Sequence, residues 1–113
     1  MFGCMNVTSN VNGTPYLRTT GVSVGTDSVD FSLGFRRIPA VGYITINVAN
    51  EIPAGTTETL PVRFTLNGNT RNVTFFGGAN VTVADLSGTG ILTVFYDWYN
   101  GTLQAISLSP ATA

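Results

Sequence analysis

Residues 61–76 read Pro-Val-Arg-Phe-Thr-Leu-Asn-Gly-Asn-Thr-Arg-Asn-Val-Thr-Phe-Phe. Asn67 and Gly68 at its centre both tolerate the positive φ angles that a type I′ turn requires. A two-residue turn pairs Leu66 with Asn69, and a four-residue turn would leave the same side chains on each face, because the parity is unchanged. The segment therefore predicts a hairpin whose inward face carries Val62, Phe64, Leu66, Val73 and Phe75.

A second hairpin signal, Asn100-Gly101, joins residues 91–99 to residues 103–108. Residues 91–99 are dense in β-branched and aromatic side chains, which favour strands. A two-residue loop predicts three cross-strand pairs: Trp98 with Leu103, Tyr96 with Ala105, and Phe95 with Ile106. The third pair lies on the opposite face from the first two, so we expect this hairpin to be apolar on both faces.

Thirteen Gly and five Pro interrupt the rest of the chain, and the longest stretches free of both span only ten residues, 43–52 and 91–100. A helix of average length, about 11–12 residues, has no uninterrupted place to form. We expect further short strands at Val22–Val24, at Val29–Leu33 with Val29, Phe31 and Leu33 inward, and at Val81–Val83.

These elements predict an all-β protein with seven or eight short strands. Since no helix is available to cover a lone sheet, we expect a single-domain antiparallel β-sandwich of the jelly-roll or immunoglobulin-like type. The sandwich would span residues 16–113, and residues 1–15, rich in Asn, Thr and Ser, would form an N-terminal arm.

The ionisable residues exclude several classes of binding site and catalytic site. The 113 residues include five Arg, six acidic residues, one Cys and no His or Lys. Without a basic excess there is little to neutralise phosphates, so we expect no nucleic-acid partner. A His-dependent triad, a Lys Schiff base and an intrachain disulfide are excluded, and we assign no chemistry to Cys4 and no cofactor or metal to the chain.

The first ten residues carry neither a basic start nor an apolar stretch of seven or more, so we expect synthesis in the cytoplasm without a secretory signal. No segment approaches 18 apolar residues, and we expect no membrane association. Five Asn-x-Ser/Thr triplets follow from the composition and, in this compartment, predict no glycosylation.

The six carboxylates are the remaining candidates for catalysis, and a glycosidase would need two of them across one cleft. Most lie beside Gly or Pro, where acidic residues are ordinary in solvated turns. Asp27 and Asp30 could also form a weak calcium site with Thr26 and Ser28, although no calcium-loop motif is present. We predict that the protein is not an enzyme and name no catalytic residue.

The aromatic stretch 95–99 admits three interpretations: a core strand, a protein interface, or a sugar-binding surface. In the third, a pyranose ring would stack on an aromatic side chain while neighbouring polar groups fix its hydroxyls. The candidate glycan contacts are Asp97, Trp98, Tyr99 and Asn100.

The strands at 43–49 and 91–99 carry one charge between them, Asp97, and the chain has no Lys. Monomeric β proteins commonly protect their edge strands with such charges, so we interpret these strands as edges that a partner completes. Arginine pairs well with carboxylates across contacts. The candidate interface residues are Arg36, Arg37, Phe76, Trp98 and Tyr99.

The Thr-, Asn- and Gly-rich, nearly uncharged pattern, which runs from Met1 through residues 35–43 to the two Asn-Gly hairpins, resembles small structural proteins of tailed bacteriophages. It is most similar to auxiliary, or decoration, capsid proteins of crAss-like phages. The resemblance implies a virion protein that docks on the capsid surface, with the major capsid protein and other copies of itself as partners. It rests on overall character and assigns no residue a role. The alternative function is a carbohydrate-binding or receptor-contacting β-sandwich, like a head fibre, that uses Asp97, Trp98 and Tyr99.

Overall fold

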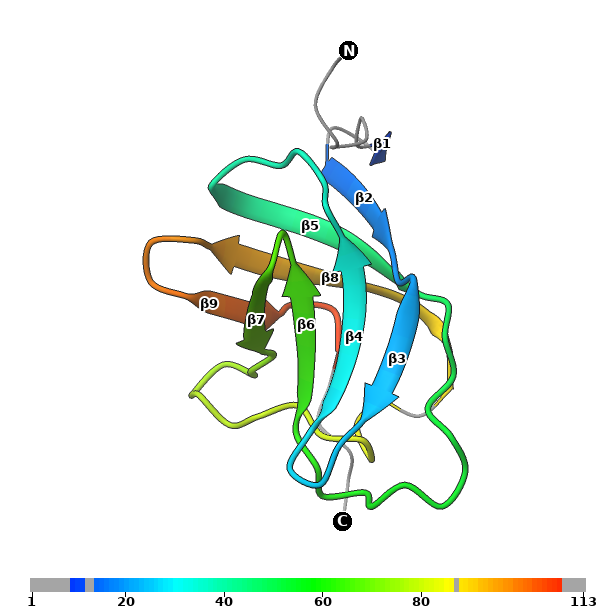
Figure 1. Cartoon of the computed structure of the whole chain (residues 1–113). Helices are drawn as coiled ribbons and strands as arrows, with labels where there is room; N and C mark the ends of the chain where they lie inside the picture. Colours follow the sequence, from blue (N-terminus) through cyan, green and yellow to red (C-terminus); the bar gives the residue numbers. More distant parts are fainter. Residues whose placement is uncertain (1–8, 12–13, 87, 109–113) are drawn as a thin grey trace.

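The computed structural model describes residues 9–11, 14–86 and 88–108, and these form strands and turns without a helix. The strands are β1 (Ser9–Val11), β2 (Thr14–Arg18), β3 (Gly21–Val24), β4 (Val29–Gly34), β5 (Val41–Val48), β6 (Val62–Leu66), β7 (Asn69–Asn72), β8 (Gly90–Asp97) and β9 (Thr102–Ala105). They form a five-stranded sheet of order β1-β2-β5-β8-β9 and a four-stranded sheet of order β3-β4-β6-β7, which face each other in Figure 1.

The two sheets enclose one apolar core. Leu17, Ile46 and Val94 of the five-stranded sheet are fully buried, as are Val29 and Phe31 of the four-stranded sheet, and all belong to one cluster. The expectation of an all-β, sandwich-like protein is therefore confirmed at this level.

The expectation of purely antiparallel sheets is wrong at two pairings. Strands β2 and β5 pair in parallel, and so do β4 and β6. The chain leaves β4 to form β5 in the other sheet and then returns, so β6 runs in the same direction as β4. Patterns within single strands do not encode this, because the period of two specifies faces and not neighbours.

The first hairpin is confirmed in its turn, register and inward face. Leu66 pairs with Asn69 across a turn in which Asn67 and Gly68 adopt φ angles of 53° and 82°. The five residues expected on the inward face are all buried: Val62, Phe64, Leu66, Val73 and Phe75. Val29, Phe31 and Leu33 of β4 are also buried as expected.

The second hairpin differs from its prediction by two residues in register. The last pair is Asp97 with Thr102, and Leu103 faces Tyr96 instead of Trp98. Consequently Ala105 pairs with Val94, and Phe95 with Gln104. The parity is preserved, so Tyr96, Leu103 and Ala105 are buried on one face as expected, whereas Trp98 leaves the strand for the turn.

The remaining segments match the predictions in part. A strand forms over the predicted Val22–Val24, whereas residues 81–83 make only isolated bridging contacts, although Val81 and Val83 are buried in the core. Ser9–Val11 pairs with β2, while residues 1–8 and 12–13 of the predicted arm, including Cys4, lie outside the described residues. The arm stays a prediction.

The low-charge strands are not edges, which overturns the interpretation made from their composition. Strand β5 lies between β2 and β8, and β8 lies between β5 and β9. The edge of β9 that does not face β8 is paired with Thr74. The Thr74 N–H donates to the Leu103 carbonyl at 2.9 Å, and the Thr74 carbonyl accepts from the Ala105 N–H at 2.8 Å. Central strands need no edge-protecting charges, because their backbone groups are already paired.

The outer face of the four-stranded sheet carries an ion pair in which Arg63 donates two hydrogen bonds to Asp30, at 2.7 and 2.8 Å. The Arg63 hydrogen bonds hold the pKa of the Asp30 carboxyl below 3.8, despite some burial that opposes the shift. A carboxyl pKa lowered by folding stabilises the protein above the unfolded pKa, and this contribution is lost as the pH falls through the folded value.

We expect Asp30→Asn to lower the free energy of unfolding at pH 6 by up to about 1 kcal/mol, the range for partly exposed ion pairs. The difference from the unsubstituted protein should be smaller at pH 2 than at pH 6, because protonation of Asp30 removes the ion pair. Urea denaturation of both proteins at the two pH values measures this. An equal difference at pH 6 and pH 2 would contradict the ion-pair explanation.

Candidate functional site

The outer face of the five-stranded sheet exposes several apolar side chains and carries few charges, Arg18 of β2 and Asp97 of β8. Alternation along β5 and β8 turns one set of side chains into the core and the other set outward. We use the name outer β5–β8 face for the outward apolar residues Val41, Tyr43, Ile91, Phe95 and Ile106. Four of them are substantially exposed, from 43% for Val41 to 66% for Ile91.

Two of these residues contact each other across neighbouring strands. Tyr43 pairs with Phe95, and their rings meet edge to face with centroids 5.4 Å apart. Ile106 directly follows β9, and its N–H donates to the carbonyl of Thr93. Thr93 is two residues after Ile91 on β8, so it faces outward as Ile91 does. The positions between them hold neutral side chains: Thr45, Asn47, Thr93, Thr102 and Gln104.

Asp97 is the single charged residue among the outward positions of β5, β8 and β9, and its carboxylate is occupied. It accepts hydrogen bonds from the N–H groups of Tyr99 and Asn100, at 3.0 and 3.3 Å, and from the Asn100 side chain at 2.8 Å. This side-chain-capped turn begins at Asp97 and explains why the hairpin loop has four residues instead of two.

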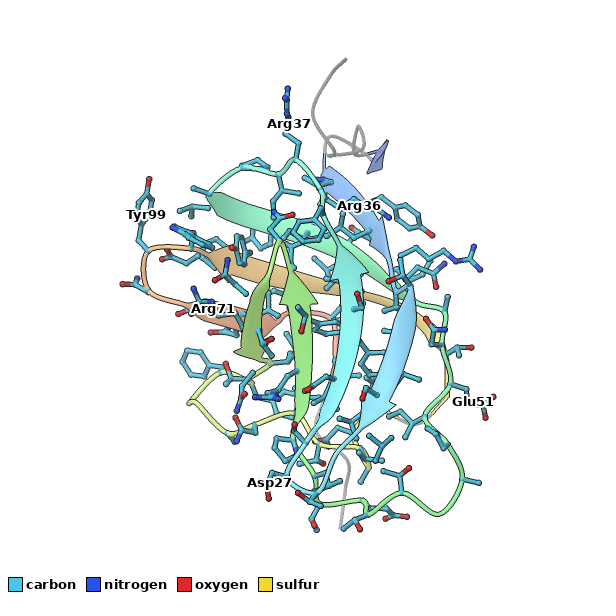
Figure 2. All side chains as sticks on the ribbon, viewed as in Figure 1. Asp27, Arg36, Arg37, Glu51, Arg71 and Tyr99 are labelled. Atoms are coloured by element: carbon cyan, nitrogen blue, oxygen red, sulfur yellow. The ribbon has the colours of Figure 1, made fainter. Side chains whose placement is uncertain are left out.

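These hydrogen bonds divide the four residues predicted to bind a glycan into two pairs. Asp97 and Asn100 face each other within the turn, whereas Trp98 and Tyr99 project toward a groove at that end of the molecule. Tyr99 is 79% exposed and stands at the tip of the turn (Figure 2). The core-strand interpretation holds for Tyr96, which is buried, and not for Trp98, which is 42% exposed.

Four of the predicted interface residues lie on two neighbouring loops at one end of the molecule, and Phe76 lies elsewhere. Arg36 and Arg37 lie in the loop between β4 and β5, where the Arg36 backbone is bound by the Asn67 side chain (Figure 2). Trp98 and Tyr99 lie in the β8–β9 turn, and Phe76, 92% exposed, lies in a separate turn after β7. None of the five belongs to the outer β5–β8 face.

Sequence reasoning missed this outer face because it treated β5 and β8 as edges. The signal was present in residues 41–48, where apolar residues occupy both alternating sets near the start of the strand. It also missed Arg71. The pairing of Leu66 with Asn69 places Arg71 opposite Phe64, on the inward side of the hairpin.

Two carboxylates border one depression elsewhere on the molecule. Glu51 and Glu58 line an open hollow of about 280 Å³, and both side chains are exposed to solvent. Glu51 points away from the sheets (Figure 2). The general acid of a glycosidase is held in a less polar environment, whereas both carboxylates here are exposed to solvent. Within the described residues, no group of three acidic or cysteine side chains could hold a metal ion.

Comparison with protein-family models, with curated proteins and with solved structures finds no match for this chain. The described part of the chain contains no helix long and apolar enough to cross a membrane.

Proposed function

We propose that this chain is a non-enzymatic structural protein of a virion, an auxiliary capsid protein that docks on the shell and stabilises the particle. The outer β5–β8 face carries the proposal. An exposed group of apolar side chains with few charges is typical of protein–protein contacts, whose centres are depleted in charged residues and enriched in aromatic ones. The bacteriophage-like composition supports the choice of partner, the major capsid protein.

The two outer faces of the molecule differ in a way that favours one docking side. Opposite the outer β5–β8 face, the four-stranded sheet presents the Asp30–Arg63 ion pair and a hydrogen bond between the hydroxyls of Thr65 and Thr70. Such polar pairs are already satisfied and well solvated. We therefore assign the capsid contact to the five-stranded sheet and leave the four-stranded sheet facing solvent.

In this proposal the attachment to the capsid is stabilised because many copies of the protein bind together. One face of this size binds modestly, but copies arranged around a symmetry axis of a capsid also contact each other, and multivalent attachment raises the overall affinity. The finer fold assignment, a jelly-roll or immunoglobulin-like sandwich, belongs to this proposal, because both architectures expose a broad sheet face of this kind.

The test is rebinding to particles of the encoding phage from which the protein has been stripped. We expect the double variant Ile91→Asp/Ile106→Asp to bind at least tenfold more weakly than the unsubstituted chain, because two carboxylates would have to be desolvated in the contact. Cosedimentation at increasing protein concentration measures the affinity, and circular dichroism verifies that the variant is folded.

The matched control is Val24→Asp/Phe35→Asp, which introduces the same charges at exposed apolar residues outside the outer β5–β8 face. Its affinity should remain within twofold of the original. Equal binding by both double variants would refute the assigned face. Failure of the unsubstituted chain to bind stripped particles, together with a monomeric mass at high concentration, would refute the function.

A further inference from the structure

A groove of about 390 Å³ opens where three loops meet at one end of the molecule. The loops are the β4–β5 connection, the β6–β7 turn and the β8–β9 turn, which lie toward the same side in Figure 1. The groove lies within the usual size range for small-ligand sites, about 300–1,000 Å³. It is separate from the outer β5–β8 face.

The groove is held in shape by hydrogen bonds between its loops. The Asn67 side chain accepts from the Arg36 N–H at 2.7 Å and donates to the Arg36 carbonyl at 2.9 Å. The Trp98 N–H donates to the Ala40 carbonyl at 2.9 Å. Both turns are thus fastened to the β4–β5 loop, and a ligand would meet a surface that needs little further ordering.

Arg71 packs against the indole ring of Trp98. Its guanidinium carbon lies 5.6 Å from the centroid of the Trp98 ring, a cation–π distance. The guanidinium also packs on Gly101, where a Cβ atom would lie 2.9 Å from Nη1. Nε of Arg71 is buried and has no acceptor among the described residues, so packing on Trp98 and Gly101, and not an ion pair, holds this side chain.

The groove combines aromatic surfaces with unused neutral polar groups. Trp98 and Tyr99 contribute exposed rings, and Ile38 contributes an apolar side chain beside them. Oδ1 of Asn69 and the hydroxyl of Tyr96 make no hydrogen bond within the described residues. Burial raises the pKa of the Tyr96 hydroxyl, which therefore stays protonated at neutral pH and can both donate and accept.

We propose that this groove binds a neutral saccharide, with a pyranose ring stacked on Trp98 and Tyr99 and its hydroxyls bound by Asn69 and Tyr96. The apolar C–H face of a pyranose suits an aromatic ring, and its hydroxyls both donate and accept. None of the residues that line the groove is charged, which favours a ligand without charge.

A proline-rich peptide is the other ligand class that aromatic grooves commonly take. The polar groups of this groove disfavour it. Proline has no N–H, so a polyproline segment supplies no backbone donor to Oδ1 of Asn69, whereas a sugar hydroxyl does. Binding of such a peptide in place of a saccharide is accordingly an outcome that would overturn the proposal.

The chain has a single tryptophan, so fluorescence excited at a wavelength that tyrosine does not absorb reports on Trp98 alone. We expect a neutral oligosaccharide from a panel of gluco-, galacto- and manno-oligosaccharides to change this fluorescence saturably at millimolar concentration or below. Tyr99→Ala and Asn69→Ala should each weaken binding at least tenfold. Phe76→Ala, an exposed aromatic residue outside the groove, should leave the affinity within twofold.

Arg71→Ala tests the positioning role. It should weaken saccharide binding and also shift the Trp98 emission of the free protein, because the indole loses its fixed neighbour. Fluorescence unchanged across the whole panel, undiminished binding by Tyr99→Ala, or a response to a proline-rich peptide alone would overturn the proposal. The double variant Ile91→Asp/Ile106→Asp should keep saccharide affinity, so failure of the groove and failure of capsid docking are distinguishable.

Discussion

Replacing Phe64 by alanine is expected to lower the free energy of unfolding by about 3–5 kcal/mol, the cost of removing a buried aromatic ring and leaving a cavity. Phe64 is 2% exposed and lies beside Phe31 on the neighbouring parallel strand, with ring centroids 5.5 Å apart. The pair sits where the four-stranded sheet contributes most bulk to the core, and small domains have only about 5–15 kcal/mol of total stability. Urea denaturation followed by circular dichroism measures the loss.

Phe76→Ala is the matched control for this prediction. The same ring is removed, but Phe76 is 92% exposed, so the change should stay within about 0.5 kcal/mol. A small effect at Phe64, similar to that at Phe76, would mean that the two sheets do not pack through this position.

Thr19→Val is expected to lower the free energy of unfolding by about 2–4 kcal/mol, although valine has nearly the same shape. Thr19 is buried where the chain bends from β2 into β3. Its hydroxyl donates to the Asn50 side chain at 2.7 Å and accepts from the backbone N–H groups of Ala49 and Asn50, at 2.9 and 3.2 Å. Valine leaves these two N–H donors without an acceptor. Each buried donor that loses its partner lowers the free energy of unfolding by about 1–3 kcal/mol.

Thr20→Val provides the comparison one residue further along. Thr20 is exposed, and its hydroxyl makes one long hydrogen bond, 3.3 Å, to the Ser32 carbonyl. Its substitution should change the stability by less than about 1 kcal/mol. Equal losses at the two positions, measured by urea denaturation, would show that the Thr19 hydroxyl does not join the bend to the segment after β5.

The Asn67-Gly68 hairpin was predictable in its turn, register and inward face because a short-range signal governs them, although β7 ends at Asn72 and not at residue 76. Two residues that tolerate positive φ fix the turn, the turn fixes the register, and the register fixes which side chains face the core. The same logic implied that Arg71 lies on the inward side, opposite Phe64. Its contact with Trp98, however, joins the two sheets and needed the structure.

In the Asn100-Gly101 hairpin, a neighbouring residue with its own turn preference overrides the turn that the dipeptide predicts. The carboxylate of Asp97 binds the N–H groups of the following turn and ends the strand two residues earlier than the dipeptide predicts. Trp98 therefore lines a groove instead of facing Leu103. The Asn-Gly signal and the Asp97 signal were both visible in the sequence, but their relative strength depends on how the turn packs against residues 38–40.

By itself the sequence determined the all-β class and the inward faces of β4 and β6, since each depends on residue type and on a period of two along a single strand. Only the tertiary structure decided which strands are central, that β2 pairs with β5 and β4 with β6, and that Tyr43, Ile91 and Ile106 meet on one outer face. Strand neighbours are chosen by contacts between segments far apart in the chain, and no spacing within one segment records that choice.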